Sequence, residues 1–412
     1  MSKREKNKVV IVGAGPSGLF CAYHLLKAGF HVDMYDHSSG PAKKFLIAGN
    51  GGLNITHSEP LESFSEKYGK NKERFKNYLN NFSPKDLQAW CQEIGVETFI
   101  GSSGRVFPKE MSAGKFLLKW LSILKNYDHF QMYLNHKLTS LKIMPDKQIK
   151  QLTFQTKDHV FSSETETLIM ALGGGSWKST GSDGQWIDMM KNIGIKTHPL
   201  LPMNSGFETN WSEFFKTHVK RHHLKKVCIK FKHFQSMGDL MLTEYGLEGG
   251  PLYALSHHIR DEILEKGSAI LYVDLKPHYT HEKIKEILES KKNKTSFSNH
   301  LRKKMAIDKK TFIFLKELLI DKGDKNEEQL LSFSKIKNIP IQLNSLRPID
   351  EAISTSGGIC FSGLTDSMES KKFPGLYFTG EMLDYEAPTG GYLLQGCFSS
   401  SFVIANTLKD KK

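Results

Sequence analysis

Apolar positions near the start of the chain follow first a strand pattern and then a helix pattern. Residues 9–12 are an unbroken β-branched run, VVIV, which is typical of a strand buried in a parallel sheet. A glycine-rich turn follows, and then a helical stretch that runs to Lys27 and stops at Ala28-Gly29. A second strand is expected over residues 31–35. This order predicts a parallel βαβ unit of about 30 residues.

The same patterns predict elements further along. Ser83-Pro84 is expected to start a helix, because serine caps helices and proline suits the first helical position. We expect helices over residues 71–94 and 111–125, strands within 128–161 with a hairpin turn at Pro145-Asp146, and a buried strand within 167–177 that runs into glycines.

The character of the chain changes near residue 200. Alternating segments such as VCIKFKHF predict antiparallel strands, and the polar, lysine-rich stretch that follows predicts several helices. Near residue 346 the glycine-rich style returns. The organisation that fits best is one discontinuous nucleotide-binding domain, 1–200 and 346–412, around an insertion that is β-rich over 201–280 and 334–345 and helical over 281–333.

Composition narrows the class of protein. A chain of 412 residues is long enough for two or three structural units, and 39% hydrophobic with 25% charged residues is typical of a globular protein. No apolar run reaches the roughly 18 residues that a membrane helix needs, and the charged start does not resemble a secretory signal. Five scattered cysteines without a C-x-x-C pair favour a reducing compartment. We therefore expect a cytoplasmic protein with no metal site and no membrane partner.

The net charge of +13 raises the question of a nucleic-acid partner. The lysines are dispersed through KREKNK, KKNK, RKK and KDKK, without regularly interleaved aromatic residues. Solvated helix faces account for such a pattern better than nucleic-acid binding does, so we expect a small-molecule substrate and consider a nucleic-acid partner unlikely. The sequence does not indicate the oligomeric state.

A G-x-G-x-x-G motif at Gly13, Gly15 and Gly18 follows the first strand and opens the helix. The first glycine permits the tight turn, the second lets the backbone approach a pyrophosphate, and the third lets the helix pack on the sheet. The pyrophosphate then lies at the helix N-terminus, where free N–H groups favour an anion. Asp36 ends the second strand, where it can accept hydrogen bonds from an adenosine ribose. A carboxylate there disfavours a 2′-phosphate, which leaves NAD or FAD.

The end of the chain favours FAD. Apolar residues 376–378 predict a strand that ends at Gly380-Glu381, a position from which an acid can reach ribityl hydroxyls. Gly390-Gly391 would let the backbone approach the flavin ring, and the dipole of the following helix would stabilise negative charge there. An ordinary strand, turn and helix is the alternative.

Taken together, these segments resemble a known group, the bacterial BaiN-type, aminoacetone-oxidase-like FAD flavoproteins of the glutathione-reductase-like superfamily. The matching pieces are VVIVGAGPSGL, KKFLIAGNGGLNITH, MALGGGSWKSTGSDG, TEYGLEGGPLYALS, RPIDEAISTSGG and GLYFTGEMLDYEAPTGGYLLQG. They span nearly the whole chain in the family's order. The resemblance implies an α/β fold with a discontinuous Rossmann-like FAD-binding domain, an inserted β-barrel-like domain and a helical subdomain.

The resemblance also implies where FAD binds. The residues expected at the cofactor are Gly13, Gly15, Pro16, Ser17, Gly18, Asp36, Lys44, Gly49, Gly51, Gly52, Leu53, Asn54, Gly173, Gly380, Glu381, Thr389, Gly390, Gly391 and Tyr392. Two departures from the family matter. Leu53 stands in GGLN where many relatives have cysteine in GGRCN, and Glu381 replaces the more common aspartate.

Candidates for acting on the substrate are weaker. His57 could be a general acid near the flavin, although a structural loop histidine is at least as good an interpretation. Arg347 could hold a substrate carboxylate or form a structural ion pair. Further candidates in the matching motifs are Lys178, Glu244, Tyr245 and Asp350.

The expected function is that of an FAD-dependent oxidoreductase that transfers hydride between flavin N5 and either a small substrate or NAD(P)H. A second nicotinamide domain is not expected, because the glycines of 171–184 lack the G-x-G-x-x-G spacing. NAD(P)H would then be a transient donor that binds directly over the flavin. A tRNA- or RNA-modifying flavoenzyme and a non-catalytic flavin-bound sensor stay open as alternatives.

Overall fold

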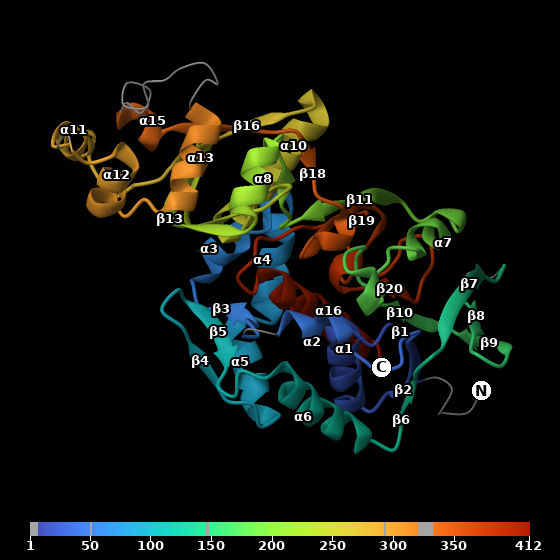
Figure 1. Cartoon of the computed structure of the whole chain (residues 1–412). Helices are drawn as coiled ribbons and strands as arrows, with labels where there is room; N and C mark the ends of the chain where they lie inside the picture. Colours follow the sequence, from blue (N-terminus) through green and yellow to red (C-terminus); the bar gives the residue numbers. More distant parts are fainter. Residues whose placement is uncertain (1–6, 50–51, 146–147, 292–293, 320–332) are drawn as a thin grey trace. The chain divides into compact units, whose positions relative to one another are not determined.

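The computed structural model describes residues 7–49, 52–145, 148–291, 294–319 and 333–412 (Figure 1). The contacts between residues divide the chain into two compact units. Unit 1 comprises Met1–Leu201 and Ser354–Lys412, and unit 2 comprises Pro202–Ile353. The beginning and the end of the sequence therefore fold together, and the chain between them forms a unit with its own core.

A five-stranded parallel sheet forms the centre of unit 1. Its strand order is β20-β10-β1-β2-β6. The strands are β20 (Leu376–Phe378), β10 (Thr167–Met170), β1 (Lys8–Val12), β2 (His31–Tyr35) and β6 (Phe130–Tyr133). Strand β1 pairs with β10 on one side and β2 on the other, and its residues 9–12 are buried. A strand covered on both faces needs apolar residues throughout, which explains the unbroken VVIV run. The predicted βαβ unit is confirmed.

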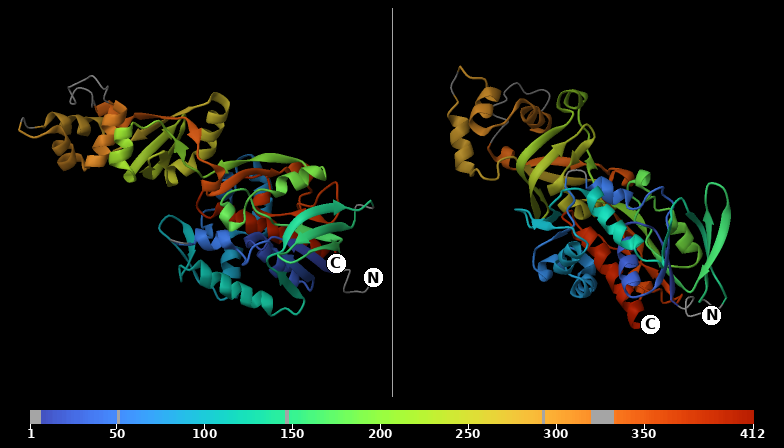
Figure 2. Two further views of the ribbon diagram at one scale, coloured as in Figure 1. Left: turned by 45° about the vertical axis from the view of Figure 1, so that its right-hand side comes forward. Right: turned by 90° about the horizontal axis from the view of Figure 1, so that it is seen from below.

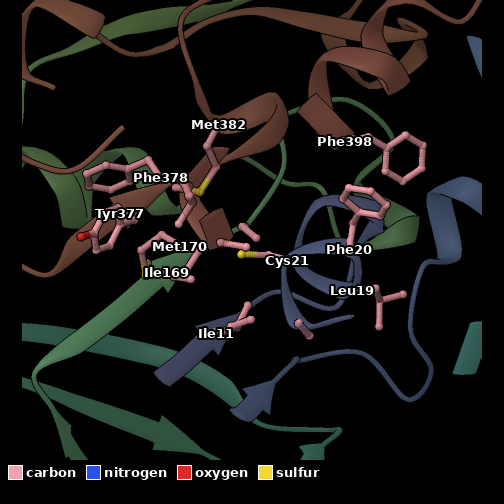
Figure 3. Packing of buried hydrophobic residues seen from close by; sticks show 14 of the residues in the cluster. Ile11, Leu19, Phe20, Cys21, Ile169, Met170, Tyr377, Phe378, Met382 and Phe398 are labelled. Atoms are coloured by element: carbon pink, nitrogen blue, oxygen red, sulfur yellow. The ribbon is translucent and has the colours of Figure 1, made fainter. Parts of the chain in front are cut away.

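Two helices from opposite ends of the sequence pack together beside this sheet. They are α1 (Pro16–Lys27) and α16 (Tyr392–Asp410), the latter the red helix that carries the C-terminus in Figure 2. Phe20 of α1 meets Phe398 of α16 edge to face, with 4.8 Å between ring centroids, and both side chains are fully buried. Figure 3 shows these rings next to the apolar residues of the sheet. Burying one such ring contributes about 2–3 kcal/mol, so this contact joins the two ends of the sequence firmly.

The predicted helical stretch 71–94 contains two helices, as its internal capping signal indicates. Ser83 accepts a hydrogen bond from the Asp86 amide at 3.3 Å, and the Asp86 carboxylate accepts one from the Ser83 amide at 2.8 Å. The helices of unit 1 that follow α1 are α2 (Lys43–Ala48), α3 (Leu61–Glu66), η1 (Gly69–Asn71), α4 (Lys72–Asn81), α5 (Pro84–Glu93), α6 (Ala113–Lys125), η2 (Lys178–Thr180), α7 (Trp186–Asn192), η4 (Phe361–Gly363) and η5 (Gly380–Met382).

Three smaller ladders complete the described strands of the first and last parts of the chain. One has the order β3-β5-β4, with β3 (Thr56–His57), β5 (Arg105–Pro108) and β4 (Thr98–Ile100). Another has the order β7-β8-β9, with β7 (Lys137–Ile143), β8 (Lys150–Gln155) and β9 (Val160–Thr165). The third pairs β11 (Thr197–Met203) with β19 (Ser354–Ile359). The hairpin turn expected at Pro145-Asp146 lies partly outside the described residues.

Unit 2 is built on a seven-stranded antiparallel sheet. Its order is β17-β16-β13-β14-β15-β12-β18. The strands are β12 (Phe207–Glu208), β13 (His222–Phe231), β14 (Phe234–Leu242), β15 (Gly246–Glu248), β16 (Ala269–Asp274), β17 (Ile339–Leu343) and β18 (Ser345–Leu346). The two edge strands β17 and β18 are separated by Asn344 alone, so the sheet curls into a nearly closed barrel.

Helices of unit 2 share one apolar core with this barrel. Ile284 and Leu301 belong to the same buried cluster as Leu271 of β16 and Ile341 of β17. The helices are α8 (Glu213–Val219), α9 (Gly250–Ala254), α10 (Ser256–Lys266), α11 (His281–Glu289), α12 (Phe297–Met305), α13 (Lys309–Leu319), α15 (Phe333–Lys337) and η3 (Ile349–Glu351). The predicted α/β fold, with a discontinuous Rossmann-like domain and a β-barrel-like insertion, is confirmed.

Candidate functional site

The G-x-G-x-x-G loop joins the end of β1 to the start of α1. A Cβ atom on Gly13, whose φ is +109°, would lie 2.2 Å from the Ala171 carbonyl oxygen, and one on Gly18 would lie 2.0 Å from the Gly13 carbonyl oxygen. These two glycines are required by close backbone packing. A Cβ on Gly15 would meet no atom within 4 Å, so this glycine borders open space at the helix N-terminus.

The N-terminus of α1 has no side-chain cap of its own. Its N-cap is Gly15, with Pro16 at the first helical position, whereas α5, α6, α8, α11 and α12 each begin with a serine or threonine that accepts a backbone hydrogen bond. Free N–H groups and the helix dipole together favour an anion at such a position. The open space beside Gly15 therefore suits a diphosphate.

A cavity of about 470 Å³ lies at the carboxyl end of the parallel sheet. Asp36 lines it, and its carboxylate accepts hydrogen bonds from the amides of Ala14 and Ser38, each at 2.7 Å. Apolar walls are provided by Val12, Leu138, Leu141, Leu172, Trp186 and Met189. An acid held by backbone amides at the end of β2, beside apolar walls, has the chemistry needed for an adenosine.

Lys44 and Glu381 were predicted separately, and the structure brings them together. Lys44 Nζ lies 2.9 and 3.1 Å from the two carboxylate oxygens of Glu381 and donates to Ser176 Oγ at 2.7 Å. The Glu381 carboxylate also accepts from the Thr355 amide at 3.0 Å. Because Glu381 is 9% exposed, these partners hold its charge in place at the end of β20. Gly380, with φ +73°, lets this turn approach α1, since its Cβ would lie 2.1 Å from Ser17 Oγ.

Two buried polar atoms in the segment after α2 lack a hydrogen-bond partner within the described chain. They are Asn54 Oδ1 and Thr56 Oγ1. The amide nitrogen of Asn54, in contrast, donates to the carbonyls of Thr56 at 2.7 Å and Val106 at 3.1 Å, which fixes the side chain. An isoalloxazine edge carries both N–H donors and carbonyl acceptors, so these orphaned atoms fit a flavin.

The same segment meets the start of α16. A Cβ on Gly391, the N-cap of α16, would lie 2.5 Å from the Thr56 backbone, so main chain packs against main chain. No side chain caps α16, and its dipole is aimed at the end that carries Gly390 and Gly391. Thr389 lies half-buried just before them. The segment around Asn54 and the N-terminus of α16 thus form one continuous surface.

Other residues of the predicted cofactor segment have packing roles. A Cβ on Gly49 would lie 2.3 Å from the Ala113 side chain, so contact with α6 accounts for that glycine. Leu53 is 2% exposed within the apolar core of unit 1, which explains an aliphatic residue where relatives have cysteine. Gly52 has φ +117° and lies beside Met111, and Gly173 has φ +73° and lies beside Ser182. Gly51 lies outside the described residues.

His57 is held by backbone on both ring nitrogens. Nε2 lies 2.9 Å from the Ser103 carbonyl, and Nδ1 accepts from the Glu59 amide at 3.2 Å. The ring also stacks on Tyr392, with 5.5 Å between centroids. Burial, and then the neighbouring Glu59 carboxylate, raise the pKa of Tyr392 above its usual value. This geometry supports the structural interpretation of His57 over a general acid.

Arg347 is engaged by carboxylates of unit 2. Its guanidinium binds Glu351 through contacts of 2.6 to 2.9 Å and Glu208 at 2.6 Å, and it lies over the ring of Tyr245 at 4.0 Å. The Tyr245 hydroxyl in turn donates to Glu248 at 2.5 Å. These contacts support the structural ion pair over a site for a substrate carboxylate.

The remaining candidates and two missed residues can now be placed. Lys178 is exposed in η2 of unit 1, Glu244 is exposed between β14 and β15, and Asp350 lies in η3. Ser176 and Thr355, which bind Lys44 and Glu381, were not predicted although both lie in the matching motifs. Spacing gives no sign of such contacts, because they join residues 132 and 26 positions apart.

The described residues offer neither a metal-binding cluster nor a membrane-spanning helix. Across the described stretches, no three His, Cys, Asp or Glu side chains gather in a way that could hold a metal ion. None of the helices described is both long and apolar enough to cross a membrane.

Comparison with known proteins gives a consistent picture. The model of the HI0933-like protein Rossmann domain matches residues 7–407. The chain is 23% identical to a 3-dehydro-bile acid delta(4,6)-reductase of Clostridium scindens, over 98% of this chain and all of that protein. It is 24% identical to a ribosomal RNA dihydrouridine synthase of Haemophilus influenzae, over 98% of both chains.

Solved structures resemble the fold at low sequence identity. A 3-ketosteroid-delta4-(5alpha)-dehydrogenase from Rhodococcus jostii aligns with a TM-score of 0.52 at 12% identity, over 98% of both chains. The FrdA subunit of the Escherichia coli quinol fumarate reductase aligns with a TM-score of 0.54 at 13% identity, over 98% of this chain and 70% of that one. The resemblance predicted from the sequence is confirmed, and the chain belongs to the HI0933-like family of FAD-binding Rossmann proteins.

Proposed function

We propose that this protein is an FAD-dependent reductase that saturates a C=C bond conjugated to a carbonyl group, with NAD(P)H as the electron donor. The names of two curated relatives support the reaction type. A 3-dehydro bile acid with delta(4,6) unsaturation and a uracil base both carry a C=C bond joined to a carbonyl. Bound FAD would supply the hydride for such a bond. The protein itself binds the cofactor and the substrate, orients them, and polarises the carbonyl group of the substrate.

The observation that carries the proposal is the arrangement of unit 1 at two helix N-termini. Gly15 heads α1 beside open space, and Gly391 heads α16 beside Asn54 and Thr56, whose orphaned atoms need partners. The first N-terminus suits a diphosphate. The second suits the pyrimidine edge of a flavin, where the α16 dipole stabilises negative charge.

Other side chains complete the proposed cofactor site. Asp36, held by two backbone amides, accepts hydrogen bonds from the adenosine ribose. Glu381 accepts from ribityl hydroxyls, and Lys44 and Thr355 fix its carboxylate for that role. Asn54 Oδ1 accepts a hydrogen bond from the flavin edge, since its amide nitrogen is already used.

The nicotinamide donor is proposed to bind directly over the flavin. Within the residues that the structure describes, one strand–G-x-G-x-x-G–helix unit is found, and we assign it to FAD. A donor without a dinucleotide domain of its own must leave before the substrate enters, which predicts alternate occupation of one face.

A second candidate is the same reduction on a uracil base within RNA. Two curated relatives are named ribosomal RNA dihydrouridine synthase, at 24% and 23% identity. Unit 2 also carries exposed basic residues around β13, α12 and α13, and Lys310 of α13 donates to the carbonyl of Val219, the last residue of α8, at 3.2 Å. They include Lys220, Lys225, Lys226, Arg302, Lys303, Lys304 and Lys309. Phosphate binding by such residues would make affinity fall steeply with salt.

The test uses the purified full chain. We expect a yellow protein whose flavin bleaches with NADH or NADPH without oxygen. A colourless protein that does not take up added FAD would contradict the proposal. The colour of the reduced protein should return on adding an enone, or, for the second candidate, on adding uridine-containing RNA. Bleaching without reoxidation by either acceptor would favour a flavin-bound sensor.

A further inference from the structure

One face of the β3-β5-β4 sheet carries Arg105 and two phenylalanines that are partly or fully open to solvent. Neighbouring strands place directly paired residues on the same side, and the register pairs His57 with Arg105 and Phe99 with Phe107. Val106 and Pro108 alternate with these residues and are buried. Arg105 and Phe107 therefore lie on one face of the sheet, with Phe99 beside them.

The end of this face away from Arg105 is apolar. The Phe99 and Phe107 rings stack with 5.7 Å between centroids, and Phe99 is 38% exposed. Met111 is 45% exposed, and its methyl group would lie 2.8 Å from a Cβ on Gly52. Met111 and Phe107 both border Gly52, since the Phe107 ring would lie 3.8 Å from the same Cβ. Apolar side chains left open to water cost free energy, which favours a ligand over them.

One end of the face carries a positive charge next to the proposed flavin site. Arg105 is exposed, and no ion pair found among the described residues involves it. Its Nε would lie 3.8 Å from a Cβ on Gly390, immediately before the N-terminus of α16. The guanidinium is thus placed where the polar end of a substrate would meet the flavin.

Three lysines near this face have carboxylate partners. Lys109 pairs with Glu97 at 2.6 Å, and Lys115 and Lys119 pair with Glu110 at 3.2 and 2.7 Å. A nucleic-acid strand needs several unpaired cations along its backbone. A single free guanidinium beside stacked rings instead suits a small apolar molecule with one polar oxygen.

We propose that this outward face, Arg105 with Phe107, Phe99 and Met111, is the substrate platform, and that its ligand is an apolar polycyclic compound with a carbonyl conjugated to a C=C bond. The inference rests on the proposed function and names the substrate class for that site. Residues i and i+2 of a strand lie about 7 Å apart, so a ligand oxygen at Arg105 places a fused ring body over the phenylalanines.

Arg105 also has a role in the reaction. When bound and reduced, FAD would supply a hydride to the carbon distal to the carbonyl, and negative charge would then develop on the carbonyl oxygen as the C=C electron pair moves toward it. Arg105 would donate hydrogen bonds to that oxygen and stabilise the charge. A solvent proton then adds to the carbon next to the carbonyl. NAD(P)H is the reductant, and it is oxidised to NAD(P)⁺.

The test measures binding of 4-androstene-3,17-dione, a rigid apolar enone, to the flavin-loaded full chain by the change in the flavin spectrum. We expect saturable binding by the wild type, and roughly 10- to 100-fold weaker binding by Arg105→Gln, since charge-assisted hydrogen bonds carry such factors. Phe99→Ala should weaken binding about 3- to 30-fold through lost apolar contact. Lys109→Gln removes the same charge from the same hairpin and should bind like the wild type.

Several results would overturn the platform. No binding by a wild type whose flavin still bleaches with NADPH would refute the inference and leave the flavin enzyme standing. Absence of bound flavin would refute the proposed function itself. Equal binding by Arg105→Gln, Phe99→Ala and the wild type would place the ligand elsewhere. Reoxidation of the reduced flavin by uridine-containing RNA but not by the enone would exclude a small apolar substrate.

Discussion

Glu381 offers the sharpest test of where the ribityl chain binds. Its carboxylate is 9% exposed and is held by Lys44 at 2.9 Å and by the Thr355 amide at 3.0 Å. It follows β20, at the carboxyl edge of the parallel sheet, where α/β proteins bind their ligands. Glu381→Gln keeps the size of the side chain and removes its charge, so it weakens every hydrogen bond to the carboxylate at once.

The expected magnitude follows from those contacts. Hydrogen bonds to a charged group contribute about 1.5–3 kcal/mol each, and an amide retains part of this. We expect the free energy of unfolding of the FAD-free protein to fall by about 1–2 kcal/mol, because Lys44 keeps Ser176 and is itself partly exposed. FAD affinity should fall about 10-fold through the weaker bond to a ribityl hydroxyl.

Glu369 provides the matched control at the opposite end of the same strand. Its carboxylate accepts from Lys411 at 2.7 Å and from the Gly375 amide at 2.7 Å, just before β20 begins. Glu369→Gln should therefore lower stability by a similar amount and leave FAD affinity unchanged. The assays are urea unfolding of the FAD-free protein and a flavin fluorescence titration. Equal FAD affinities for wild type and Glu381→Gln would refute the assignment of Glu381 to the ribityl chain.

Three further predictions follow from individual contacts. Asn54→Leu removes the orphaned Oδ1 and should weaken FAD binding about 10-fold in the same titration, whereas unchanged affinity would remove Asn54 from the flavin edge. Burial lowers the pKa of His24 to about 4, so between pH 6.5 and 4 the unfolded chain binds a proton that the folded chain does not. The free energy of unfolding therefore decreases as the pH falls through this window, by up to about 1.4 kcal/mol per pH unit. Urea unfolding of the His24→Leu variant should lack this pH-dependent component. Arg347→Gln should lower the free energy of unfolding by about 1–3 kcal/mol and leave the rate of flavin reduction by NADPH unchanged, and a loss of that rate with stability intact would restore Arg347 to the active site.

Local sequence patterns predicted the βαβ unit because the residues that determine it are close to one another in the sequence. The VVIV run, the glycines of the loop and the stop at Gly29 each act on neighbouring residues. The paired helices within 71–94 were predictable for the same reason, since Ser83 and Asp86 cap α5 across three residues.

Contacts between distant segments were not predictable from spacing. Lys44 and Glu381 each appeared as a separate cofactor residue, and only the fold shows that they bind one another. The glycine at 49 looked like a position of close cofactor approach, but its neighbour is Ala113. Arg105 was missed because nothing in RVFP signals an exposed guanidinium beside Gly390.

In the proposed function, the flavin-loaded protein passes two electrons from NAD(P)H to a carbonyl-conjugated C=C bond. The most direct measurement reduces the bound flavin with NADPH without oxygen, adds 4-androstene-3,17-dione in equal amount, and follows both the flavin colour and the mass of the product. The account predicts stoichiometric return of the yellow colour and a product with two additional hydrogen atoms. A flavin that stays bleached, or a steroid recovered unchanged after the colour returns, would contradict it.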